Sequence, residues 1–225
     1  MKSIFLFVFS LAIILSLVSF RKENLDLNKL LKVGGLVSAG TTADLDHYKD
    51  PYDFNLPRKK QTDDIVAMAI TPNDQCYYWY SDGTVTSGTT NDLDKNKSTY
   101  DYTLPNGKSP KDIVGMGIAS NNYCYVWFSD GTVSAGTSKD LSKFKKPYKY
   151  SLAPGKTPAD IVGIGIASND YCYVWYSDGT VSSGVTNDLD KYRSPYNYSI
   201  VFDKTHDEII GTGIASNNYC YAWYK

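Results

Sequence analysis

Four cysteines recur at one fixed interval and could act as metal ligands or as disulfide partners. They stand at Cys76, Cys124, Cys172 and Cys220, each 48 residues after the last. A ring of thiolates on one axis could hold a metal, and secreted proteins commonly pair their cysteines. Equivalent residues of packed sheets, however, lie about 10 Å apart, beyond the Cα separation of about 7 Å that a disulfide spans. The sequence therefore predicts four buried free thiols and no metal or other cofactor.

Carboxylates, amides and aromatic rings form a second set that could do chemistry. Such groups hydrogen-bond to sugar hydroxyls and stack on the apolar face of a sugar ring. The candidate ligand-binding residues are Asp44, Tyr48, Asn73, Asp92, Asn121, Asp140, Phe144, Asn169, Asp188, Tyr192 and Asn217. Two alternatives stand beside this interpretation: Asx side chains cap turns, and Asp-Leu-Asp segments could ligate calcium. Calcium is disfavoured, because one unit has Asp140-Leu141-Ser142 instead and no complete calcium loop is present.

Catalytic chemistry finds little support in the sequence. The two histidines, His47 and His206, occupy non-equivalent positions and are expected to be solvated loop residues. No Gly-x-Ser-x-Gly elbow, phosphate-binding loop or His-Glu-x-x-His motif is present. An active site is usually one asymmetric group of residues, whereas these residues repeat. We predict that the protein is not an enzyme.

A gapless 48-residue repeat must position all of these residues. The segment Asp82–Gly88 recurs at 34–40, 130–136 and 178–184, and a tryptophan recurs at the same interval. The tryptophans are Trp79, Trp127, Trp175 and Trp223. The repeat defines four units, 34–81, 82–129, 130–177 and 178–225.

Each unit contains four expected strands, A to D, described best by the segment 112–152. Strand A spans 112–119, strand B 123–128, strand C 132–137 and strand D 147–152. We expect Val114, Met116 and Ile118 on one face of strand A, and Ile113, Gly115, Gly117 and Ala119 on the other. Cys124, Val126 and Phe128 share one face of strand B, opposite Tyr123, Tyr125 and Trp127. Asp130-Gly131 predicts a tight type I′ hairpin between strands B and C.

Strands A and B are apolar on both faces, so both faces must be covered. Blades packed around an axis meet this need, and the glycines leave room for a neighbour's large side chains. The fold class is therefore predicted to be all-β, a small β-propeller of four four-stranded blades. Strands C and D of 34–57 and strands A and B of 209–224 would build a composite blade that closes the ring. A larger oligomeric ring and an open stack are the alternatives.

Strand reversals place the A–B turns and the C–D loops on one rim, which gathers the candidate ligand-binding residues. The equivalent positions Tyr48, Asn96, Phe144 and Tyr192 show that one unit lacks a ring there. The tryptophans and their neighbouring tyrosines are expected to pack between blades, with a sugar-stacking platform as the alternative.

The first 33 residues differ from the repeats. Lys2 precedes an apolar stretch from Ile4 to Phe20, typical of an export signal and long enough to reach the lower limit for a bilayer span. We expect residues 1–20 to be a cleaved signal peptide or an N-terminal membrane anchor, residues 21–33 a spacer, and residues 34–225 secreted or extracytoplasmic. The formal net charge of −1 gives no support to nucleic-acid binding.

Two stretches carry a resemblance to known repeats. Asp160-Ile-Val-Gly-Ile-Gly-Ile-Ala and Tyr173-Val-Trp-Tyr-Ser-Asp-Gly-Thr-Val181 resemble the repeats of tectonin-like and tachylectin-like lectin propellers. They also resemble repeats of the regulator-of-chromosome-condensation type. The resemblance covers most of residues 34–225, and many tectonin-like and tachylectin-like proteins bind sugars on surfaces. It implies a propeller that binds surface glycans.

Two functional hypotheses follow. The first is a multivalent carbohydrate-binding module with one weak site per blade, whose partners are surface glycans. The second is a structural or protein-interaction propeller of the cell surface, whose partner is another surface protein.

Overall fold

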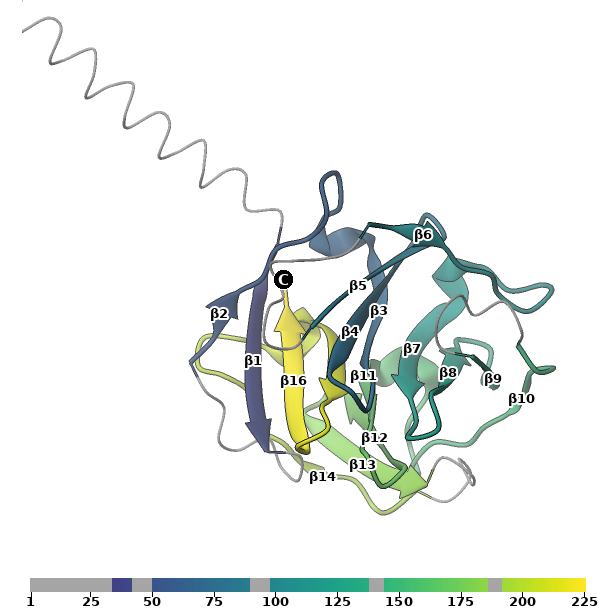
Figure 1. Ribbon diagram of the computed structural model, residues 1–225. Coiled ribbons are helices and arrows are strands. Elements are labelled where there is room, and N and C mark those ends of the chain that lie inside the picture. Colours follow the sequence, from purple (N-terminus) through teal and green to yellow (C-terminus); the bar gives the residue numbers. More distant parts are fainter. Residues whose placement is uncertain (1–33, 42–49, 90–97, 138–143, 186–191) are drawn as a thin grey trace, which may run out of the picture. The chain divides into compact units, whose positions relative to one another are not determined.

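The computed structural model describes residues 34–41, 50–89, 98–137, 144–185 and 192–225 (Figure 1). The chain divides into two units, Met1–Lys32 and Val33–Lys225. The first unit lies outside the described residues, and so does the segment predicted to be a signal peptide or membrane anchor. No helix in the described ranges is long and apolar enough to cross a membrane.

The described residues form strands in the order that the repeat predicts. The inner strands, A in each repeat, are β3 (Ile65–Ile70), β7 (Ile113–Ile118), β11 (Ile161–Ile166) and β15 (Ile209–Ile214). The B strands are β4 (Gln75–Tyr80), β8 (Tyr123–Phe128), β12 (Tyr171–Tyr176) and β16 (Tyr219–Tyr224). The C strands are β1 (Leu36–Thr41), β5 (Thr84–Thr89), β9 (Thr132–Thr137) and β13 (Thr180–Val185). The outer D strands are β2 (Tyr52–Asp53), β6 (Tyr100–Asp101), β10 (Tyr148–Lys149) and β14 (Tyr196–Asn197).

A short 3₁₀ helix precedes each inner strand. These helices are η1 (Thr62–Asp64), η2 (Pro110–Asp112), η3 (Pro158–Asp160) and η4 (His206–Glu208). Each ends in a carboxylate that accepts a hydrogen bond from the backbone N–H three residues earlier, as from Ser109 to Asp112 at 2.7 Å. This capping box fixes the direction in which the chain enters the inner strand.

The strands pair into four antiparallel sheets, which are the blades of one propeller (Figure 1). Blade 1 is β3-β4-β5-β6, blade 2 is β7-β8-β9-β10, and blade 3 is β11-β12-β13-β14. The composite blade is β15-β16-β1-β2, in which Leu36 to Thr41 pair with Tyr224 to Tyr219. The inner strands contact one another in the order β3, β7, β11, β15 and back to β3. The predicted four-bladed ring, closed by N- and C-terminal strands, is therefore confirmed.

The core lies between the blades, with one hydrophobic cluster at each junction. At the junction of blades 2 and 3, Trp127 from one sheet meets Cys172 and Val174 from the next. All four tryptophans and all four cysteines are fully buried. This confirms the prediction that the tryptophans pack between blades, since each B strand presents its Trp and a Tyr to one neighbour and its Cys to the other.

The predicted faces of the inner strand are wrong at its first two residues. A β-bulge separates Ile113, which pairs with Phe128, from Gly115, which pairs with Trp127. Ile113 consequently joins the cluster of Met116 and Ile118, whereas Val114 packs on the opposite side. An unpaired extra residue reverses the alternation of side chains beyond it, and nothing in the pattern of apolar residues marks its place.

The hairpin between strands B and C is also of a different type from the one predicted. In blade 2 only Gly131 has a positive φ, of 78°, and its N–H donates to the carbonyl of Phe128 at 3.0 Å. This geometry is a type I turn followed by a left-handed glycine, rather than a type I′ turn. Asp130 stays in an ordinary conformation and accepts a hydrogen bond from the Thr132 N–H at 3.1 Å.

Candidate ligand-binding site

The A–B turns and the chain that leaves the C strands meet at one rim, which we call the Asn rim. We define it by the turns 73–74, 121–122, 169–170 and 217–218 together with Tyr123, Lys145, Tyr171 and Arg193. The Arg193 guanidinium lies 5.4 Å from the Tyr171 ring and donates to its hydroxyl at 3.1 Å. In blade 2 the Lys145 ammonium lies 5.2 Å from the Tyr123 ring. These contacts place the residue that follows the C–D loop beside the residue that follows the A–B turn, as the count of strand reversals predicts.

The asparagines of the Asn rim hold their own turns. The Oδ1 atoms of Asn121 and Asn217 accept the N–H of the residue two positions later at 3.0 Å, and that of Asn169 does so at 3.2 Å. Asn73 instead accepts the Thr71 hydroxyl, and Thr71 caps the Gln75 N–H at 3.1 Å. All four asparagines are exposed. Each acceptor oxygen is therefore used by the turn, and the exposed side-chain NH2 is the group with which a ligand could interact.

Three of the four blade junctions are tied together across the Asn rim. Ser120 donates its N–H and hydroxyl to the Asp170 carboxylate at 2.8 and 2.9 Å. Ser216 makes the same pair of bonds to Asp74 at 2.7 and 2.8 Å. A further tie runs from the Ser168 hydroxyl to Asn218 at 3.4 Å. Pro72 occupies the equivalent position at the junction of blades 1 and 2, and it has neither an N–H nor a hydroxyl to donate.

The other predicted ligand-binding residues are only partly placed by the structure. Those outside the described residues are Asp44, Tyr48, Asp92, Asp140 and Asp188. Phe144 and Tyr192 are described, and both are half-buried against the cluster of their junction. Burial raises the pKa of the Tyr192 hydroxyl well above its usual value. Phe144 and Tyr192 thus present only part of their rings to a ligand, and the assignment of these residues to a site stays a prediction.

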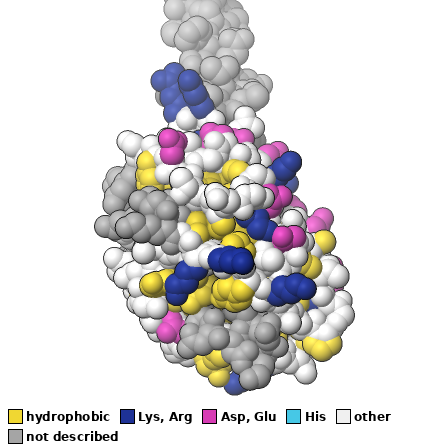
Figure 2. Space-filling view, turned by 90° about the vertical axis from the view of Figure 1, so that its right-hand side faces the viewer, with side chains coloured by type: hydrophobic (Ala, Val, Ile, Leu, Met, Phe, Trp, Pro, Cys, Tyr) yellow, Lys and Arg dark blue, Asp and Glu magenta, His cyan; other side chains and the backbone are white. Residues whose placement is uncertain are grey.

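A groove of about 500 Å³ lies between blades 1 and 2. Residues 103–106 of blade 1 form one wall, and residues 144–147, just before β10, form the other. Figure 2 faces the side that carries β10 and shows hydrophobic side chains gathered among basic ones. The predicted ligand-binding residue Phe144 lines this groove.

A second cavity, of about 290 Å³, is lined by all four inner strands at the ends where they begin. Its lining side chains are apolar apart from that of Thr212, and they include the equivalent residues Val66, Val114, Val162 and Ile210. The Thr212 hydroxyl is fully buried and has no hydrogen-bond partner in the described part of the chain. This axial cavity opens on the rim opposite to the Asn rim, because it adjoins the starts of the inner strands.

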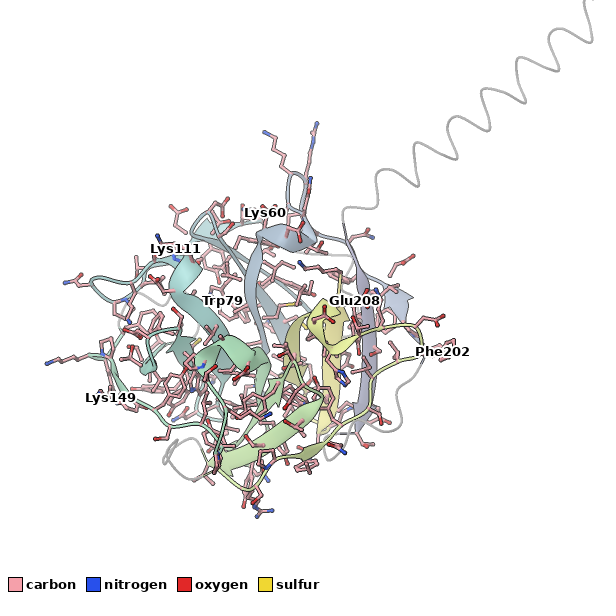
Figure 3. The ribbon with its side chains drawn as sticks, turned by 180° about the vertical axis from the view of Figure 1, so that it is seen from behind. Lys60, Trp79, Lys111, Lys149, Phe202 and Glu208 are labelled. Atoms are coloured by element: carbon pink, nitrogen blue, oxygen red, sulfur yellow. The ribbon has the colours of Figure 1, made fainter. Side chains whose placement is uncertain are left out.

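That opposite rim is braced by lysines from the D–A loops, and Figure 3 labels one of them, Lys60. In blade 2 the Lys108 ammonium pairs with Asp130 and lies 4.5 Å from the Phe128 ring. The hydrogen bond from Lys108, followed by that from the Thr132 hydroxyl, lowers the pKa of Asp130. The same pairing joins Lys60 to Asp82 and Lys156 to Asp178. These groups are committed to structure rather than to a ligand.

The cysteines and the described histidine do not assemble a reactive centre. The four cysteines are free and buried, as predicted, and burial raises the pKa of Cys172 to about 12. Thiols in this state are poor nucleophiles and poor metal ligands. His206 differs from the expected solvated residue, because its ring packs edge-on against Tyr198 at 4.9 Å. Within the described ranges, no three His, Cys, Asp or Glu side chains lie close enough to hold a metal.

The sequence interpretation missed the cations of the Asn rim. Lys145 and Arg193 each follow a predicted ring residue, Phe144 or Tyr192, and each lies over a tyrosine of its own blade. The signal was present, because a basic residue follows this position in every unit, including the one that has Asn96 in place of a ring: Lys49, Lys97, Lys145 and Arg193. Exposed amides, half-buried rings and these cations together can bind a polar ligand with an apolar face.

No family model matches the chain, and no curated protein matches it either. Among solved structures it is similar to U3-55K, at 10% identity and a TM-score of 0.38, covering 68% of this chain and 43% of that one. It is also similar to the WD40 repeats of RRP9, at 9% identity and a TM-score of 0.37, covering 68% and 42%. A third is PorZ, a bacterial surface component of the type-IX secretion system of Porphyromonas gingivalis, at 12% identity and a TM-score of 0.35, covering 68% and 17%. The chain spans less than half the length of these proteins, and such distant similarities carry no functional information.

The four-bladed propeller is an architecture suited to binding a ligand or another protein. It presents two rims of turns and loops on a rigid ring of sheets.

Proposed function

We propose that this protein is an extracytoplasmic, non-enzymatic module that binds carbohydrate at the Asn rim, with weak sites in blades 2 and 3. The observation that carries the proposal is a recurring group of three side chains. Asn121, Tyr123 and Lys145 in blade 2 correspond to Asn169, Tyr171 and Arg193 in blade 3. An exposed amide and a cation beside an aromatic ring suit a sugar, which offers hydroxyls at its edge and C–H bonds on its face.

Repetition supports multivalent rather than single-site recognition. Shallow sites of this kind bind weakly one at a time, but several on one rigid ring raise the affinity for a surface that displays many copies of the ligand. Export of the repeats, which the first 20 residues suggest, would bring the rim to such a surface.

The test is a glycan array followed by calorimetry with the glycans that bind. Asn121→Asp and Asn169→Asp keep the Oδ1 atom that caps each turn but replace the exposed NH2 donor by a carboxylate oxygen. We expect each to weaken glycan binding several-fold without changing the unfolding temperature. Asn197→Asp, in β14 and away from the rim, is the matched control. The absence of any glycan binding at millimolar concentration would contradict the proposal.

A protein-interaction role is the second candidate, and a different observation favours it. Tyr52, Tyr148 and Tyr196 stand at equivalent positions of the outer strands and are 36 to 45% exposed. Phe202, in a D–A loop, is 91% exposed and projects from the molecule in Figure 3. Exposed aromatic side chains at regular intervals are typical of surfaces that another protein covers. This role gains support if the array is blank.

A further inference from the structure

The junction of blades 1 and 2 differs from the other three at its inner strands. The other inner strands carry glycines against the neighbouring blade, at Gly115, Gly117, Gly163, Gly165, Gly211 and Gly213. A Cβ added to any of them would come within 2.4 to 2.9 Å of a neighbouring side chain. Blade 1 has Ala67 and Ala69 at these positions and buries both against blade 2. The two methyl groups need space that the other junctions do not provide.

The same junction lacks the tie across the Asn rim. Serine-to-Asx hydrogen bonds join the other three pairs of adjacent blades. At this junction Pro72 stands at the position of the donor serine and Asn122 at that of the acceptor. Pro72 has neither an N–H nor a hydroxyl to donate. Two independent departures from the repeat therefore fall between blades 1 and 2, which is also where the groove lies.

The walls of the groove combine apolar surface with positive charge. Leu104 and Phe144 pack on the cluster beneath while remaining partly exposed, and two prolines, Pro105 and Pro147, stand beside them. Lys145 and Lys146 are exposed and line the same groove, and none of its lining residues within the described ranges is acidic. The equivalent pairs are Lys49-Asp50, Lys97-Ser98 and Arg193-Ser194, so this unit alone has two adjacent cations at this position of the repeat. The groove is consequently complementary to a ligand with an apolar ring face and a negative charge.

We propose that the groove between blades 1 and 2 binds an acidic carbohydrate of the hexuronate type. The sugar ring lies against Phe144 and Leu104, and its carboxylate lies beside the ammonium group of Lys146, while the Lys145 ammonium lies over Tyr123. The groove volume of about 500 Å³ suits one or two sugar residues. This inference rests on the proposed carbohydrate-binding function and names one ligand class and one junction for it.

The experiment titrates the full-length protein by calorimetry with tetragalacturonic acid and with its methyl ester, which keeps the sugar rings but removes the charges. The acid should bind, and its affinity should fall as salt rises, because exposed charge pairs are screened. The ester should bind more weakly. Lys146→Gln should weaken binding of the acid by about two- to fivefold, the range expected for one exposed ion pair. The same substitution should leave binding of the ester unchanged.

Lys149→Gln is the matched control, since Lys149 is an exposed lysine of β10 that does not line the groove. Phe144→Leu tests the ring contact and should weaken both acid and ester. Equal affinity for acid and ester, or equal effects of the two lysine variants, would overturn the acidic-sugar site. In that case binding of other glycans that remains sensitive to Asn169→Asp would leave the function at the Asn rim standing. If no saccharide binds at all, both proposals fail.

Discussion

The Lys108–Asp130 pair illustrates how single residues stabilise this propeller. The Lys108 stem is buried, and its ammonium lies between a carboxylate and an aromatic ring. Asp130 is more than half exposed, so water screens the pair and limits its contribution to about 1 kcal/mol or less. Because the pairing lowers the pKa of Asp130 in the folded state, the stability that it contributes must depend on pH.

We expect Lys108→Met to lower the free energy of unfolding more at neutral pH than at pH 2. A carboxyl group whose pKa is lowered by folding stabilises the fold above its unfolded pKa of about 3.9. That contribution is lost as the pH falls through the lower, folded value. Methionine keeps most of the apolar stem but cannot pair with the carboxylate. Urea unfolding from pH 7 down to pH 2 measures the difference between wild type and variant, with Lys149→Met as the control. A difference that stays constant with pH would assign the role of Lys108 to packing alone.

The inner strands show how an element sets the distance between blades. Gly115 lies against Ile164 of the next blade, and an added Cβ would come within 2.6 Å of its Cδ1 atom. The equivalent pair at the junction of blades 1 and 2 is Ala67 and Met116. Gly211 also faces a methionine, Met68, and an added Cβ there would come within 2.8 Å of its Cγ atom. Burial of the Ala67 methyl group therefore depends on how blades 1 and 2 pack together and not on a facing methionine alone.

Gly115→Ala is expected to destabilise the protein by about 1–3 kcal/mol, because overpacking forces neighbouring side chains or sheets to move. Adding Ile164→Val, which removes the Cδ1 atom nearest to the added Cβ, should recover part of that loss. The two substitutions should thus be strongly non-additive in a double-mutant cycle followed by chemical denaturation. A Gly115→Ala variant as stable as wild type would mean that the blades are not closely packed at this point.

At the scale of the whole molecule, closure of the ring depends on pairing between the two ends of the repeat region. β1 and β16 pair along their full length, with Gly35 close against the Tyr224 carbonyl. In repeat numbering, Lys225 corresponds to Ser81 and Gly34 to Asp82, so these residues occupy consecutive positions of a B–C hairpin. The Lys225 N–H donates to the backbone carbonyl of Glu208, just as the Ser81 N–H donates to that of Asp64. The composite blade is therefore an ordinary blade whose hairpin is cut.

A circular permutant of residues 34–225 should fold if Lys225 is joined directly to Gly34 and the chain is opened between Ser129 and Asp130. The new join restores one hairpin, and the new ends cut an equivalent exposed turn. We expect a single cooperative thermal transition, within a few degrees of that of the unpermuted segment. Opening the chain within β8, between Val126 and Trp127, should prevent folding, because both residues are fully buried. An unfolded Ser129/Asp130 permutant would show that the blades are not interchangeable in this way.

The positions of many site residues could be predicted from the sequence, but their hydrogen bonds and the groove could not. Alternation and strand reversals put the turn asparagines on one rim together with the residues around the C–D loops, as Tyr171 and Arg193 show. The alternation of apolar and polar residues could not reveal that the Oδ1 atom of Asn121 accepts a hydrogen bond within its own turn. It also could not reveal that Phe144 lines a groove, because the second wall comes from the preceding unit.

The sequence by itself determined the repeat, the strands and the closure of the ring. Each of these depends on local patterns of side chains and on a period that one chain displays in full. Only the tertiary structure decided the bulge that moves Ile113 to the face of Met116, the packing of Ala67 and Ala69 against blade 2, and the groove beside Phe144. The physical reason is that these features arise from the fit between residues roughly 48 apart in the chain, or from one unpaired residue in a sheet. Such fits depend on atomic distances across a junction, which the order of residues along one strand does not contain.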